Sequence, residues 1–259
     1  MTTLLSQSLA QYPLLHTCFS KYVTWVLANV PTDQLEHYDL IQILLRNDVQ
    51  RLGRVEALLQ RACDVLSMSP DSLARAFGFV DDLLTDDPEK IHDVLAEPLV
   101  AVDLSDHGFD EIRRPQPPSG SDQMLVSDFT ARRNGLKFAL EVKTVRMEQG
   151  IQPGEFLGDP LQPYWWSNML RSNAITKIQD KSRRVLRQLS ATSSALKCDK
   201  KLLVIYSRRL GPSTLLDENE ATDQLEQLSM LYPEVDVFCL KLYFGEVYFY
   251  PPLPLFGSA

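Results

Sequence analysis

Residues 127–146 read SDFTARRNGLKFALEVKTVR, and this stretch decides the fold expected for the rest of the chain. It predicts two strands, Met124–Thr130 and Leu136–Val145, because apolar residues alternate with polar ones on both sides of a polar turn. The turn, Arg132-Arg133-Asn134-Gly135, contains the Asn-Gly pair that tolerates the positive φ of a tight hairpin. The stretch therefore predicts a β-hairpin.

Three charged residues occupy positions in this hairpin where a fold normally buries apolar side chains. Successive side chains of a strand point to opposite faces, so Glu141 and Lys143 share one face of the second strand. Folding Asp128 back across the turn brings it beside them. The alternative without a functional role is a solvent-exposed strand face with a cross-strand salt bridge. Such a salt bridge contributes about 0.2–1 kcal/mol to folding stability.

Asp128 followed by Glu141-Val142-Lys143 resembles the motif of the PD-(D/E)XK nuclease superfamily, which includes restriction endonucleases, junction resolvases and repair exonucleases. In that family the two acids hold Mg²⁺, and the lysine positions or activates the attacking water. The resemblance implies that Asp128, Glu141 and Lys143 are catalytic and that Mg²⁺, or Mn²⁺ in its place, is the cofactor. It also implies a metal ligand in the backbone carbonyl of Val142. Ser127 stands where the family name has proline.

The resemblance also implies a third acid in the metal shell. Many family members carry it on the first core helix, about three turns before a Gly-aromatic step, and Glu97 stands eleven residues before Gly108-Phe109. Pro98 follows directly, and the residue before a proline is pushed away from helical geometry. We therefore expect the helix to restart at Pro98 and leave Glu97 at its edge, with Asp93 or Asp103 as substitutes.

A later helix, predicted over Asn168–Leu189, carries the candidate nucleic-acid contacts. Lys177 and Gln179 resemble the polar residues that family members aim at the site or at phosphate. Lys181 and Arg184 recur one turn apart and are expected to line a phosphate track. The alternative for these residues is an ordinary solvated basic face.

The charge distribution favours a nucleic-acid partner at residues 126–190 and not along the rest of the chain. The net charge of the 259-residue chain is −8, which argues against a protein that coats nucleic acid over its whole surface. Residues 1–110 hold 7 Lys and Arg against 17 Asp and Glu, whereas residues 126–190 hold 11 against 6. The hairpin therefore lies in the basic section of an acidic chain.

The rest of the sequence predicts two regions, 1–87 and 88–259. Residues 1–85 have helical periodicity and no convincing strand pattern. From Pro88 the expected order is helix, three strands, helix, strand, helix and a final strand pair. That order resembles the αβββαβ core of the restriction-endonuclease-like fold, an α/β domain with a mixed sheet.

Other classes of site and compartment find little support in the sequence. No apolar run approaches the roughly 20 residues of a membrane span, and the first residues lack the pattern of a secretory signal. The four cysteines are scattered, as expected for reduced thiols in a cytoplasmic protein. There is no Walker loop, dinucleotide fingerprint or Gly-x-Ser-x-Gly elbow.

These observations predict a Mg²⁺-dependent nuclease that hydrolyses phosphodiester bonds in DNA, an endonuclease of the restriction, defence or repair type. Cleavage of both strands would favour a homodimer. The first alternative is a nuclease fold kept as an inactive binding or assembly subunit. The second is a protein–protein adaptor built on the acidic N-terminal helices.

Overall fold

The computed structural model of the chain describes residues 8–88, 90–116, 126–145, 183–207, 218–242 and 247–253. The chain forms two compact units, Met1–Asp106 and His107–Ala259. The helix that ends at Asp106 thus belongs to the first unit. The sequence interpretation assigned it to the nuclease-like domain, and that functional assignment stays a prediction.

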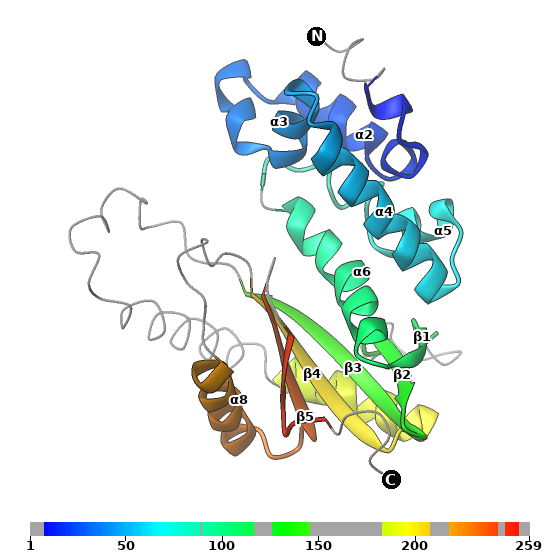
Figure 1. Cartoon of the computed structure of the whole chain (residues 1–259), viewed down its shortest axis with the longest axis vertical. Helices are drawn as coiled ribbons and strands as arrows, with labels where there is room; N and C mark the ends of the chain where they lie inside the picture. Colours follow the sequence, from blue (N-terminus) through cyan, green and yellow to red (C-terminus); the bar gives the residue numbers. More distant parts are fainter. Residues whose placement is uncertain are drawn as a thin grey trace, which may run out of the picture. The chain divides into compact units, whose positions relative to one another are not determined.

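The regular elements in the described residues of the first unit are all helices, as expected for residues 1–85 (Figure 1). Its elements in chain order are α2 (Pro13–Asn29), the 3-10 helix η1 (Thr32–His37), α3 (Asp39–Leu45), α4 (Val49–Leu66), α5 (Pro70–Ala76) and α6 (Lys90–Asp106). The rings of Phe19 and Phe79, both fully buried, lie 5.2 Å apart in its core. No helix in the described ranges of the chain is long and apolar enough to cross a membrane.

Side-chain oxygens accept from backbone donors at the starts of α2 and α5. The two carboxylate oxygens of Glu56, on α4, accept from the N–H groups of Leu14 and Leu15 at 3.0 and 2.8 Å, so a distant acid caps α2. The Ser69 side chain accepts from the Ser72 N–H at 3.3 Å and so caps the start of α5.

The helix α6 runs unbroken through Pro98, contrary to the expectation that it restarts there. A proline inside a helix removes one hydrogen bond and costs about 3 kcal/mol. Burial of one side of α6, where it packs against α4, offsets this cost: Ala96, Val100 and Leu104 are at most 1% exposed. Glu97 therefore lies within the helix, and not at its edge.

The second unit contains a mixed, open sheet of six strands in the spatial order β1-β2-β3-β4-β5-β6 (Figure 1). The strands are β1 (Asp110–Arg113), β2 (Phe129–Arg133), β3 (Leu136–Val145), β4 (Lys200–Ser207), β5 (Val237–Leu242) and β6 (Val247–Tyr250). β3, β4 and β5 run parallel, and the pairs β1–β2, β2–β3 and β5–β6 are antiparallel. The prediction of an α/β chain with a mixed sheet is confirmed at this level.

The predicted hairpin joins β2 and β3 through a turn of two residues. Asn134 and Gly135 both have positive φ, 50° and 78°, and Arg133 pairs with Leu136. Arg133 therefore belongs to the strand, although the sequence interpretation placed it in the turn. It is buried: its Nε donates to the His107 carbonyl at 2.9 Å.

One face of the sheet is covered by two helices, α8 (Glu218–Leu231) and the helical residues 183–196. Ala139 of β3 belongs to the same buried cluster as Val185 and Leu189 of the second of these helices. On the other face, the Phe109 ring lies 5.3 Å from Phe138 and 6.2 Å from Phe249. Because side chains alternate, Glu141 and Lys143 share the helix-covered face with Ala139.

The helix 183–196 extends beyond the predicted end at Leu189. The intervening residues include neither proline nor glycine, so nothing in their chemistry stops the helix earlier. It ends where Lys197 takes the left-handed conformation, with φ 52°, and the Cys198 N–H donates to the Ser193 carbonyl at 2.9 Å. Residues 168–182 of the predicted helix lie outside the described residues.

Candidate functional site

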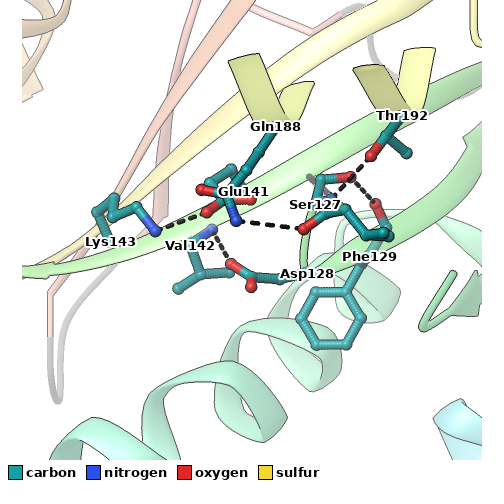
Figure 2. Close-up of polar contacts among 9 residues, drawn as sticks. Ser127, Asp128, Phe129, Glu141, Val142, Lys143, Gln188 and Thr192 are labelled. Carbon is teal, nitrogen blue, oxygen red and sulfur yellow. Dashed lines mark hydrogen bonds and ion pairs between the residues drawn. The ribbon is translucent and has the colours of Figure 1, made fainter. Parts of the chain in front are cut away.

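The candidate site begins where the β2–β3 ladder stops. Phe129 pairs with Leu140, and the same register continued by one residue sets Asp128 opposite Glu141. Asp128 itself has left the strand, and its Oδ2 accepts a hydrogen bond of 2.7 Å from the Val142 N–H (Figure 2). A carboxylate thus takes the place of a backbone acceptor at this end of β2.

Glu141 and Lys143 form an ion pair on the helix-covered face of β3 (Figure 2). The Lys143 Nζ lies 2.6 Å from Glu141 Oε1. The Glu141 side chain is 0% exposed, whereas that of Lys143 is 24% exposed. The alternative of a solvent-exposed salt bridge therefore does not describe this pair, because the Glu141 carboxylate is fully removed from water.

The electrostatic surroundings of Asp128 are divided between burial and positive charge. Burial raises the pKa of the Asp128 carboxyl above its ordinary value, since it disfavours the charged form. The groups that lower this pKa in opposition are the ammonium of Lys143, the N–H of Val142 and the guanidinium groups of Arg114 and Arg184. Three cations from separate parts of the chain therefore act on this carboxylate, although burial outweighs them.

The Val142 carbonyl faces the same side of β3 as the Val142 N–H. In an extended strand both backbone groups of a residue point to the same neighbour, and here the N–H points to Asp128. Among the described residues, those before Phe129 have left the ladder, so no β2 residue pairs with Val142. This carbonyl is therefore directed at the edge where Asp128 lies.

The donor chemistry fits a hard divalent cation. Asp128, Glu141 and the Val142 carbonyl offer oxygen donors, the atoms that Mg²⁺ prefers, and Mg²⁺ typically takes one or two carboxylates while it keeps several waters. Burial raises the pKa of Asp128, and a divalent cation bound at this carboxylate would favour its charged form. Within the described ranges, no three His, Cys, Asp or Glu side chains cluster as a metal site.

Protein comparisons add no family to this picture. No protein-family model, curated protein or solved structure matches the chain. The functional interpretation therefore depends on the residues of the site and on their geometry.

The other predicted site residues are distributed as follows. Glu97 belongs to the first unit, so its role as a metal ligand stays a prediction. Lys177, Gln179 and Lys181 lie outside the described residues. Arg184 is exposed near the start of the described part of its helix, and it is among the groups that lower the pKa of Asp128.

Three residues of the site were missed by the sequence interpretation. Gln188 and Thr192 lie on the buried side of the helix 183–196 and bond to the backbone just before Asp128. Their signal was present: with Val185 and Leu189 they occupy the i, i+3, i+4, i+7 stripe, where a polar residue is unusual. The third residue, Arg114, directly follows β1 and had no local signal.

Proposed function

We propose that residues 88–259, which comprise α6 and the second unit, form a restriction-endonuclease-like domain that hydrolyses phosphodiester bonds in DNA with Mg²⁺ or Mn²⁺. The observation that carries this proposal is the contact of 2.7 Å between Asp128 Oδ2 and the Val142 N–H. It holds one carboxylate on the backbone between the buried carboxylate of Glu141 and the ammonium of Lys143. The proposal is supported because Asp128 is thereby held beside the strand that carries Glu141 and Lys143, the other two residues of the motif.

The chain order of the elements supports the same proposal. From α6 the chain runs helix, three antiparallel strands, helix and a parallel strand, which is the order of the αβββαβ core. The sheet is mixed, and the acids lie where β2 begins and along the adjacent β3. Backbone hydrogen bonds hold a strand pair of this kind in place. Carboxylates on or beside such strands are therefore positioned more precisely than carboxylates on loops.

Asp128, Glu141 and the Val142 carbonyl would hold the cation, which when bound neutralises phosphate charge and lowers the pKa of a coordinated water. The Lys143 ammonium, partly exposed beside Glu141, is placed to donate to a phosphate oxygen or to the attacking water. Arg184 and Arg114 supply positive charge near Asp128 for the flanking phosphates. In a homodimer, two such sites would serve the two DNA strands.

Calorimetry with Mg²⁺ and Mn²⁺ tests the proposal directly. Wild-type protein is expected to bind the cations, and Asp128→Asn and Glu141→Gln are expected to abolish binding. Asp236→Asn is the matched control, because this carboxylate also bonds to a backbone N–H, that of Lys201 at 2.8 Å. If the wild type binds DNA but no divalent cation, the chain is better described as an inactive nuclease-fold binding or assembly subunit.

A further inference from the structure

The segment 126–128 carries Asp128 but makes no ladder bonds to a neighbouring strand. The segment is irregular, and the pairing of β2 with β3 begins at Phe129. Backbone N–H and C=O groups that are removed from water need partners. Ser127 is 3% exposed, so its backbone has to find partners outside the sheet.

The helix 183–196 supplies those partners from one face. The Ser127 N–H donates to Thr192 Oγ1 at 2.7 Å (Figure 2). Gln188 Nε2 donates to the Val126 carbonyl at 3.2 Å. Gln188 and Thr192 are four residues apart, so they lie one turn apart on the same side of the helix. The residues that they bond to precede Asp128 directly.

Both side chains are polar residues at places where an apolar one would pack at lower cost. Thr192 and Gln188 are 3% and 7% exposed. Among the described residues, the Gln188 Oε1 is buried without a hydrogen-bond partner, and such a group costs about 1–3 kcal/mol. Packing alone does not explain an amide here, whereas its bond to Val126 does.

We propose that Gln188 and Thr192 are positioning residues, which set the Asp128 carboxylate against β3 by holding the backbone of Val126 and Ser127. The connection runs from the helix to the backbone, from the backbone to Asp128, and from Asp128 to the Val142 N–H. The functional part of this inference rests on the proposed role of Asp128 as a metal ligand. Removal of a group that orients a metal ligand typically lowers metal affinity or activity by about 10–100-fold.

Two measurements on the full chain test the inference. Amide exchange at Val142 reports whether Asp128 still accepts its hydrogen bond, with no metal present. Calorimetry with Mn²⁺ reports the consequence for the proposed site. Thr192→Val and Gln188→Met are expected to speed Val142 exchange and to weaken Mn²⁺ binding by about tenfold or more.

Two further variants separate positioning from loss of folding. Thr192→Ser keeps the hydroxyl and is expected to restore wild-type exchange and affinity. Ser193→Ala removes a hydrogen bond from the same helix, 3.1 Å long and made to the Cys198 carbonyl, and is expected to change neither. Exchange of Val142 at the wild-type rate in Thr192→Val overturns the inference. Absence of Mn²⁺ binding in the wild type, with faster exchange in Thr192→Val, overturns the proposed function and leaves the positioning of Asp128 supported.

Discussion

The buried ion pair of Glu141 and Lys143 makes the most quantitative prediction. Removing the ammonium with Lys143→Met keeps most of the apolar stem and leaves the carboxylate without the cation at 2.6 Å. Breaking a buried pair in this way costs about 3–5 kcal/mol. Because Lys143 is 24% exposed, water can partly replace it, so we expect the lower end, about 3 kcal/mol in the free energy of unfolding.

The assay is a double-mutant cycle measured by urea unfolding, followed by circular dichroism with EDTA present. Glu141→Gln with Lys143→Met is expected to cost less than the two single changes together, with a coupling of about 1–3 kcal/mol. Lys200→Met is the matched control: its partner Asp236 is 31% exposed, so the change is expected to cost at most about 1 kcal/mol. Additive effects at Glu141 and Lys143 would refute the reasoning.

Three further predictions concern Asp128, Arg184 and Glu56. Because burial raises the folded-state pKa of Asp128, the folded chain holds that proton more tightly than the unfolded chain, and stability is lost as the pH rises from the ordinary value of 3.8 through the folded pKa. Metal-free Asp128→Asn is therefore expected to gain stability relative to wild type as the pH rises across that range. Urea unfolding at several pH values measures this difference. A difference that does not change with pH would show that the carboxyl is not desolvated. Arg184→Ala is expected to weaken DNA binding and to lower its salt slope by about one, while Arg183→Ala leaves the slope unchanged; equal slopes for both variants would contradict a phosphate contact. Glu56→Ala uncaps α2 and is expected to cost about 1–2 kcal/mol in thermal or urea unfolding, against almost nothing for the exposed Glu36→Ala, and a cost equal to that of Glu36 would count against the cap.

The hairpin was predictable because its determinants are local. Asn134-Gly135 specifies a two-residue turn, and that turn sets the register that carries Asp128 toward Glu141. The exact end of β2 was less predictable. Arg132 and Arg133 were read as turn residues, but Arg133 is buried on the strand with its guanidinium 5.6 Å from the centre of the Phe109 ring. That contact joins residues far apart in sequence.

The positioning contacts at the site required the fold. Thr192 and Ser127 are 65 residues apart, and Gln188 and Val126 are 62 apart, so no local pattern links them. The polar residues on the inward stripe of the helix marked both positions as unusual without naming their partners. The unbroken helix at Pro98 shows the opposite case, in which tertiary packing overrides a local rule.

A cleavage panel tests the central claim most directly. Double-stranded, single-stranded and branched DNA, with RNA for comparison, are incubated with Mn²⁺ or with EDTA, using wild type, Lys143→Met and the control Lys200→Met at a temperature where all three are folded. The account predicts Mn²⁺-dependent cleavage of DNA by wild type and by Lys200→Met, with a loss of about 10²-fold or more in Lys143→Met. Cleavage by Lys143→Met at the wild-type rate, or no cleavage of any substrate by wild type, would contradict it.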